Sequence, residues 1–309
     1  MKTLCADLGG SRVKLAVVED GRVAASEMFA VGANTAETLA AVVEKGRGLM
    51  CRTGGSFAGI AVAAPGIVDE ETRRVVVCNG KYAGLEDIDL TAWARREFNL
   101  DLRIVNDARA ALMGELAYGC AKGETDAVIV ILGTGVGTSA VSGGRIVRGR
   151  HFTHGLLGGH LPVSFDGDRR CTCGAMNCLE AYVGSWALKE MAGDPEYDYR
   201  RLECDYAAGD EKARRLFGIV SRALGAGTVA LAHAFDPEAV IWSGGVSRFA
   251  ALIDAAQRYV HENAWTPWGK IRFLKAADPE ASVTLGLHSL FLGNGERGMG
   301  NGERGTELR

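Results

Sequence analysis

The sequence lacks several features that would place it in a specialised class of protein. A net charge of −3 and an even spread of basic residues exclude the polycationic patch that is typical of nucleic-acid binding. The first residues contain no secretory hydrophobic region, because Asp7 interrupts the early apolar run. No uninterrupted apolar stretch is long enough to cross a membrane. We therefore expect a cytoplasmic protein with neither nucleic-acid nor membrane partners.

The amino-acid composition is typical of a soluble globular protein. The chain has 309 residues, of which 47% are hydrophobic and 24% charged, and this length allows two domains with separate cores. Three of the eight cysteines lie within residues 171–178, and the others are scattered through apolar segments. This distribution favours metal binding plus reduced thiols over a disulfide framework.

The apolar pattern predicts two similar strand, glycine-loop, strand units. The first begins with strands at residues 3–7, 13–18 and 22–31. The second begins with strands at residues 127–132, 138–141 and 145–147. Further strands are expected at 57–63, 102–105 and 239–242, and helices at 34–45, 89–98, 108–118, 210–234, 247–260 and 281–292. Asn34, Asp89 and Ser247 are the expected helix caps. Residues 293–309 repeat Gly-Asn-Gly-Glu-Arg-Gly and predict a disordered tail.

Glycine loops follow three of these strands. Asp7-Leu8-Gly9-Gly10-Ser11 can aim backbone N–H groups and a hydroxyl at phosphate oxygens, and Asp7 can hold hydrated Mg²⁺, although an ordinary hairpin turn is the alternative. Leu132–Gly137 supplies a second such loop, so that two loops could clamp one triphosphate. Ser243-Gly244-Gly245 is either a third nucleotide contact or a plain strand-to-helix turn. The first loop matches neither G-x-x-x-x-G-K-[ST] nor G-x-G-x-x-G.

The best candidate for chemistry is Asn106-Asp107, at the junction of a strand and a helix. In phosphoryl transfer a carboxylate can accept the proton of the attacking hydroxyl, and Asp107 could fill that role. The alternative is that Asp107 merely caps the helix that follows it.

Three cysteines and a histidine predict a zinc site. Three thiols and one imidazole suit a closed tetrahedral Zn²⁺ site, which leaves no position for a catalytic water and is therefore structural. His151 and His154 are competing fourth ligands, and free cysteines in a glycine-containing loop are the alternative. The predicted ligands are His160, Cys171, Cys173 and Cys178.

Taken in order, these motifs resemble those of the ROK family of bacterial sugar kinases and related repressors. The matching segments are Asp7 to Ser11, Pro65-Gly66, Asn106-Asp107, Gly133 to Gly137, Gly159-His160 and Cys171 to Glu180. The resemblance implies an α/β protein with the two-lobed actin-like/hexokinase (ribonuclease H-like) ATPase fold and an inter-lobe cleft. It implies a lobe at residues 1–118, a lobe at 119–292 and a final helix at 281–292 that packs back on the first lobe.

The resemblance also implies an ATP-dependent sugar kinase that requires Mg²⁺ and carries structural zinc. Asp107 is then the catalytic base, and the expected sugar contacts are Asn79, Asn106, Asp107, His160 and Glu180. The expected ATP contacts are Asp7, Gly9, Gly10, Ser11, Lys14, Gly133, Thr134, Gly135, Gly137, Gly244 and Gly245. The expected acceptor is a hexose or an amino sugar, and family resemblance suggests a homodimer or homotetramer.

One position departs from the family pattern. Kinases of the family usually carry E-x-G-H, whereas this sequence has Leu157 in place of the sugar-binding glutamate. A lost charge-assisted hydrogen bond of roughly 1.5 to 3 kcal/mol should weaken glucose-like recognition or signal a different substrate. The alternatives are a catalytically weak sugar sensor of the same fold, without a DNA-binding domain, and an acyl-phosphate-forming kinase, which the zinc loop disfavours.

Overall fold

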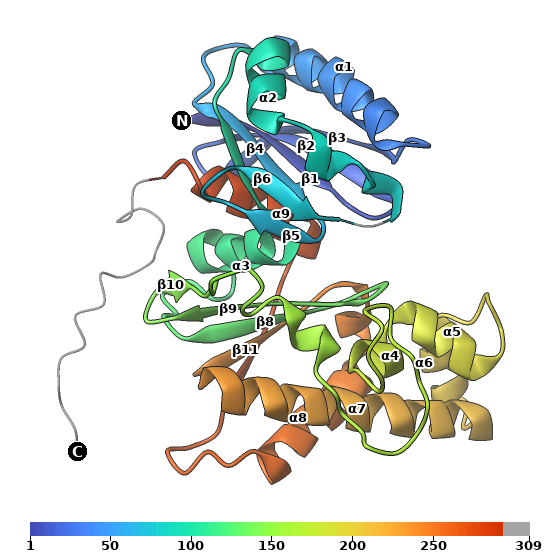
Figure 1. Ribbon diagram of the computed structural model, residues 1–309. Coiled ribbons are helices and arrows are strands. Elements are labelled where there is room, and N and C mark those ends of the chain that lie inside the picture. The colour runs from blue at the N-terminus through green and yellow to red at the C-terminus, as the bar shows by residue number, and fades with distance from the viewer. Residues whose placement is uncertain (79, 293–309) are drawn as a thin grey trace. The chain divides into compact units, whose positions relative to one another are not determined.

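The computed structural model describes residues 1–78 and 80–292 and divides into two compact units (Figure 1). Unit 1 contains Met1–Gly123, Arg148–His154 and the segment from Ala277 onward, and unit 2 contains Glu124–Val147 and Gly155–Ala276. Asn79 and the predicted tail at 293–309 lie outside the described residues. The short segment Arg148–His154 thus belongs to unit 1, although unit 2 precedes and follows it in the chain.

Unit 1 is built on a five-stranded sheet with the order β3-β2-β1-β4-β7. The first three strands form the predicted antiparallel meander, and β4 and β7 continue the sheet parallel to β1. The strands are β1 (Lys2–Leu8), β2 (Arg12–Glu19), β3 (Arg22–Ala30), β4 (Gly59–Ala64) and β7 (Leu102–Asn106). Strand β4 is buried along its whole length, because helices cover both faces of the sheet.

Helices α1 (Thr35–Thr53) and α2 (Leu90–Phe98) cover one face of this sheet, and α3 (Asp107–Tyr118) and α9 (Pro279–Ser289) cover the other (Figure 1). The predicted caps of α1 and α2 are confirmed: Asn34 accepts a hydrogen bond from the N–H of Glu37, and Asp89 from that of Ala92. The hairpin of β5 (Ile67–Asp69) and β6 (Arg74–Val77) and the short helical turns at Gly80–Tyr82 and Leu85–Asp87 were not predicted.

The α3 and α9 helices meet backbone to backbone. A Cβ atom added at Gly114 of α3 would lie 1.9 Å from the carbonyl oxygen of Ser282, and one added at Gly286 of α9 would lie 1.8 Å from that of Ala110. The Ser282 hydroxyl donates a hydrogen bond to the buried Glu115 carboxylate. Only glycine permits this approach, so the two glycines fix α9 against the helix that begins with Asp107.

Unit 2 repeats the topology of unit 1 in a sheet with the order β10-β9-β8-β11-β12. Its strands are β8 (Ala127–Leu132), β9 (Val136–Ser142), β10 (Arg145–Ile146), β11 (Ala239–Ser243) and β12 (Arg272–Lys275). The first three strands again form an antiparallel meander, followed by two parallel strands. This repeat confirms the predicted pair of strand, glycine-loop, strand units, although β12 was not predicted.

The helices of unit 2 are less well predicted. They are α4 (Glu180–Val183), α5 (Ser185–Ala192), α6 (Tyr199–Ala207), α7 (Glu211–Phe235) and α8 (Ala250–Asn263). The predicted Ser247 cap is wrong, because Ser247 lies in a short helical turn, Gly245–Arg248, and its hydroxyl donates to the carbonyl of Gly244. Helix α8 therefore begins at Ala250, with Phe249 before it. The first three helices of this group were missed.

Within the described residues, α7 alone has the length and apolar composition that a membrane-crossing helix would need. However, 56% of its most apolar window is buried inside the structure. Leu216, Leu224 and Leu231 of this helix belong to the hydrophobic core of unit 2. These contacts are typical of a core helix. A core helix can have the same length and apolar composition as a membrane-crossing helix.

Candidate functional site

The first glycine loop of unit 1 surrounds a hollow of about 160 Å³ between β1 and β2. A Cβ atom at Gly9 would lie 2.7 Å from the carbonyl oxygen of Arg12, so this turn requires glycine. The Tyr82 hydroxyl donates to the Gly9 carbonyl (2.9 Å), and the Lys14 ammonium donates to the Glu280 carbonyl (2.8 Å). The hollow is lined by Asp7, Gly9, Gly10, Ser11, Arg12, Lys14, Met28 and Glu280. Five of the predicted ATP contacts thus lie together here.

Asn106, rather than Asp107, caps helix α3. Its Oδ1 accepts hydrogen bonds from the N–H groups of Ala108 (2.9 Å) and Arg109 (3.2 Å), and its amide donates to the Gly66 carbonyl (2.9 Å). Asp107 is the first residue of the helix, and its Oδ1 accepts from the N–H of Ala108 at 2.8 Å. The alternative that Asp107 serves as the helix cap is therefore wrong.

The charge of Asp107 acts on the carboxyl group of Asp7 within unit 1. Burial raises the pKa of Asp107 above its ordinary value, although hydrogen bonds at the start of α3 offset part of this increase. Burial and the charge of Asp107 raise the pKa of Asp7 to about 7, and the charge of Lys14 acts in the opposite direction. Two carboxylates that repel each other beside a glycine loop form a site suited to a hard cation.

The raised pKa of Asp7 predicts a pH-dependent stability. The folded state binds more protons than the unfolded state between about pH 4 and pH 7, so the contribution of Asp7 to the free energy of unfolding decreases as pH rises through this window. We expect Asp7→Asn to raise the melting temperature at pH 8 in metal-free buffer, and to raise it less at pH 5. The exposed Asp101→Asn serves as the control. An equal effect of Asp7→Asn at both pH values would contradict the assignment.

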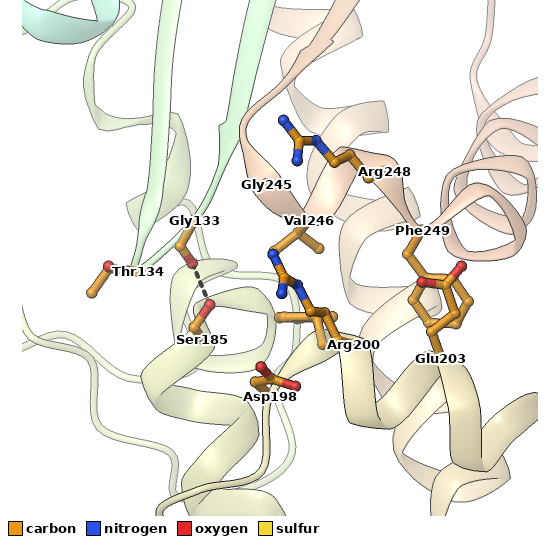
Figure 2. Close-up of a pocket in the computed structure, with 11 residues that line it drawn as sticks. Gly133, Thr134, Ser185, Asp198, Arg200, Glu203, Gly245, Val246, Arg248 and Phe249 are labelled. Atoms are coloured by element: carbon orange, nitrogen blue, oxygen red, sulfur yellow. Dashed lines mark hydrogen bonds between the residues drawn. The ribbon is translucent and has the colours of Figure 1, made fainter. Parts of the chain in front are cut away.

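The second glycine loop opens onto a larger cavity inside unit 2. The Ser185 hydroxyl donates to the Gly133 carbonyl (2.8 Å), which ties the loop to the start of α5 (Figure 2). The cavity has a volume of about 420 Å³ and is lined by three of the predicted ATP contacts, Gly133, Thr134 and Gly245. Its other lining residues are Ser185, Asp198, Tyr199, Arg200, Glu203, Val246, Arg248 and Phe249. Sequence reasoning missed these eight, because they belong to no glycine motif and several lie on the unpredicted α5 and α6.

The remaining predicted ATP contacts are Gly135, Gly137 and Gly244, and each lies in or packs against the segment of the second glycine loop. Gly135 ends the loop, and its carbonyl accepts a hydrogen bond from the N–H of Gly133 at 3.0 Å. Gly137 lies within β9, opposite Ile131 of β8. Gly244 follows β11 with a φ of 84°, a conformation that favours glycine, and a Cβ there would lie 2.2 Å from the Leu132 carbonyl oxygen.

The four predicted zinc ligands form one cluster. One ligand atom from each of His160, Cys171, Cys173 and Cys178 lies within 4.8 Å of all the others. The His160 Nδ1 to Cys171 Sγ distance is 3.4 Å, and the Cys173 Sγ to Cys178 Sγ distance is 3.7 Å. A tetrahedral Zn²⁺ with its usual bond lengths would separate its ligands by about 3.5 Å (N to S) and about 3.8 Å (S to S). The donor set and spacing therefore fit zinc, with His160 rather than His151 or His154 in the cluster.

Glu180 joins this cluster to the second glycine loop. One carboxylate oxygen accepts from the N–H of Val136 (3.0 Å), and the other accepts from the hydroxyl of Thr172 (2.7 Å), which lies between two of the cysteines. Only 9% of Glu180 is exposed. Gly159, the residue before His160, packs closely against the same strand, because a Cβ atom there would lie 2.1 Å from the Val136 carbonyl oxygen. Glu180 and the residue that precedes His160 thus both contact the Val136 backbone.

Comparison with known proteins decides the family. The model of the ROK family matches residues 3–293. The chain belongs to the ROK family. A glucokinase of Thermotoga maritima is 27% identical over 281 residues, which cover 82% of this chain and 84% of the relative.

Solved ROK structures confirm the predicted two-lobed actin-like fold class. The ROK hexokinase from Thermus thermophilus is 28% identical with a TM-score of 0.79, and the match covers 93% of this chain and 96% of that one. A ROK family glucokinase from Streptomyces griseus, in complex with glucose and AMPPNP, is 26% identical with a TM-score of 0.78. This match covers 94% of this chain and 99% of that one.

This ROK chain differs from the expected E-x-G-H pattern at an exposed position. Leu157 begins the short helical turn Leu157–His160, and 46% of its surface is exposed. Gly158, the next residue, donates its N–H to the Thr138 hydroxyl (2.9 Å). The turn therefore keeps Gly159 and His160 of the expected pattern and departs from it at Leu157.

Gly135 offers a direct test of the Glu180 position in this ROK chain. A Cβ at Gly135 would lie 2.4 Å from the Glu180 carboxylate oxygen, whereas one at Gly133 would have open space. We expect Gly135→Ala to displace Glu180. Through the sugar contact that the family resemblance implies for Glu180, this should raise the KM for sugar by about tenfold, which corresponds to roughly one lost hydrogen bond to a charged group. Steady-state kinetics measure the KM. Gly133→Ala controls for folding stability, and an unchanged KM for sugar in Gly135→Ala would contradict the prediction.

Proposed function

We propose that this ROK chain transfers the γ-phosphoryl group of ATP to a hydroxyl of a hexose or amino sugar, with Asp107 as the catalytic base. An ATP-dependent sugar kinase agrees with the glucokinase relatives, whose matches span most of both chains. The observation that supports this role of Asp107 is that the two residues at the start of α3 have different functions. Asn106 caps the helix and leaves Asp107 available for chemistry.

Asp107 is suited to accept the proton of the attacking sugar hydroxyl. Burial raises its pKa towards the range in which a carboxylate is an efficient base, while the first N–H groups of α3 keep the anionic form accessible. In phosphoryl transfer the protein mainly positions its groups and stabilises charge. A single carboxylate that removes one proton is therefore sufficient as the general base.

The glycine loops are proposed to bind ATP. The first loop, with Ser11 and Lys14, would donate N–H, hydroxyl and ammonium groups to phosphate oxygens. The cavity of about 420 Å³ beside Gly133 and Gly245 would hold the adenosine. Bound Mg²⁺ would neutralise phosphate charge, and Asp7 is the carboxylate that would hold it through water.

The cysteine cluster is proposed to hold one structural zinc ion. The ligands would be His160 through Nδ1, Cys171, Cys173 and Cys178, which together close a tetrahedral site. The other ring nitrogen of His160 is then left to bond a sugar hydroxyl, and Glu180 would accept from a second hydroxyl. Asn106 and Asn79 are the remaining proposed sugar contacts. Zinc would stiffen the loop that places these groups.

The acceptor is proposed to be a sugar whose recognition does not need a carboxylate at position 157. Leu157 offers only apolar surface there, so we expect a preference that differs from that of a kinase with E-x-G-H. The catalytically weak sensor is not favoured, because the matched kinases cover nearly the whole chain. A cytoplasmic homodimer or homotetramer remains our proposal for location and assembly.

A coupled ADP-release screen tests the proposal. Purified protein with Mg²⁺ and ATP should release ADP with at least one free hexose, amino sugar or related polyol, and release should stop when Mg²⁺ is chelated. The same screen without sugar gives the background rate of hydrolysis. Measurable sugar binding without turnover of any of these sugars would instead support the sensor.

A further inference from the structure

Arg109, two residues after Asp107, is fully buried in unit 1. It has 0% exposure and is among the largest side chains in the protein that are completely removed from solvent. A buried guanidinium is costly unless its donors are paired, and arginine is almost never buried without such partners. The placement of this residue on the helix of the proposed base therefore calls for a specific role.

The guanidinium is paired with a carboxylate from the β5–β6 hairpin. Arg109 donates to one oxygen of Glu70 at 3.1 Å, and Arg148 donates to the other at 2.8 Å. The exposure of the Glu70 side chain is 12%, so both contacts are partly shielded from water. The carboxylate therefore bridges two arginines that come from distant parts of the sequence.

The same guanidinium also holds the backbone of the segment Arg148–His154. It donates to the carbonyl oxygens of Phe152 (2.9 Å) and His154 (3.3 Å). The segment turns sharply, with positive φ angles at Gly149 and Phe152, and the N–H of His154 donates to the carbonyl of Arg148. Three parts of unit 1 are thus joined at one side chain: helix α3, the β5–β6 hairpin and Arg148–His154.

The clamped segment leads directly into the loop of the proposed sugar contacts. Gly155 follows His154, and its carbonyl accepts from the hydroxyl of Thr138 at 2.7 Å. His160 is only six residues beyond His154. The chain is thus held at His154 by Arg109 and at Gly155 by Thr138, which leaves the backbone little conformational freedom at the start of this loop.

We infer that Arg109 is a positioning residue for sugar phosphorylation, because its clamp on Arg148–His154 fixes the chain from which the His160 loop begins. This inference rests on the proposed kinase function. Arg109 does not itself touch the substrate. Its guanidinium holds the segment Arg148–His154 on the helix that begins with Asp107, through a fork of hydrogen bonds that lysine cannot reproduce.

Arg109→Lys and Glu70→Gln test the role, with the exposed Arg150→Gln of the same segment as the control. Arg109→Lys keeps the charge but loses the planar fork. We expect kcat/KM for sugar to decrease on the order of 10- to 100-fold in Arg109→Lys, because small misplacements have effects of this size. Glu70→Gln should give a smaller decrease in the same direction. The KM for ATP should stay within about twofold, since the proposed adenosine cavity contains neither residue.

Amide hydrogen exchange of the full chain measures, independently of activity, how strongly Arg109 restrains the segment Arg148–His154. In Arg109→Lys, we expect faster amide exchange in residues 148–154 and also in 155–161, whereas Arg150→Gln should change neither. If exchange increased only in 148–154 and sugar kinetics were unchanged, Arg109 would be merely structural and the inference overturned. If the wild type lacked turnover, the proposed function would fail. Faster exchange in residues 155–161 of Arg109→Lys would still show whether Arg109 restrains this loop.

Discussion

Asp107→Asn should lower kcat by about 10²- to 10⁴-fold, the range attributed to a general base. Asparagine keeps the oxygen that accepts the N–H of Ala108, and Asn106 continues to cap α3, so the fold should be unchanged. The amide cannot accept the proton of a sugar hydroxyl. Single-turnover kinetics at saturating sugar and ATP measure the chemical step directly.

The matched control is Asp101→Asn, which removes a carboxylate from an exposed surface ion pair with Arg95. Such a pair contributes little to stability, so kcat and the melting temperature should both be close to those of the wild type. Sugar affinity in Asp107→Asn should also remain largely intact. A kcat near that of the wild type would eliminate Asp107 as the base.

Cys173→Ser should release the proposed zinc ion and destabilise unit 2. Even the loss of a neighbouring partner of a metal ligand costs 10- to 100-fold in affinity, and the loss of a ligand itself should cost more. Because zinc binding contributes directly to folding free energy, we expect a large decrease in melting temperature. Metal analysis of the purified protein should give one zinc per wild-type chain and much less in the variant.

Cys204→Ser is the appropriate control, because Cys204 is an exposed free cysteine of helix α6 outside the cluster. It should keep both the zinc content and the melting temperature of the wild type. A chelator added to the wild type should reproduce the loss seen in Cys173→Ser. A wild-type protein without zinc, with the melting temperature unaffected by Cys173→Ser, would reject the proposed metal site.

The predictable part of the fold and of the candidate site was the part encoded locally. Each glycine loop follows a short apolar strand, so the sequence contains both the turn and its place at the end of a strand. The zinc ligands were predictable for a similar reason, because three of them lie within eight residues. The meander of each unit followed from apolar runs separated by turn residues.

The unpredicted part depends on contacts between distant residues. Asp198, Arg200 and Arg248 line the cavity of about 420 Å³ in unit 2, but only the packing of α6 beside the Gly245 turn brings them together. The bonds from Arg109 to Glu70 and Phe152 likewise join residues about forty positions apart. No local pattern of charge or apolar residues distinguishes these side chains from solvated ones.

The glycine contact between α3 and α9 has a consequence for biosynthesis. Glu115 and Ser282 are 167 residues apart, so a ribosome must add more than half of the chain after α3 before its partner emerges. Until then α3 exposes the strip of backbone and small side chains that later packs against α9. We expect nascent chains stalled before residue 277 to depend on chaperones. The packing of α9 against α3 would then be among the last events of synthesis.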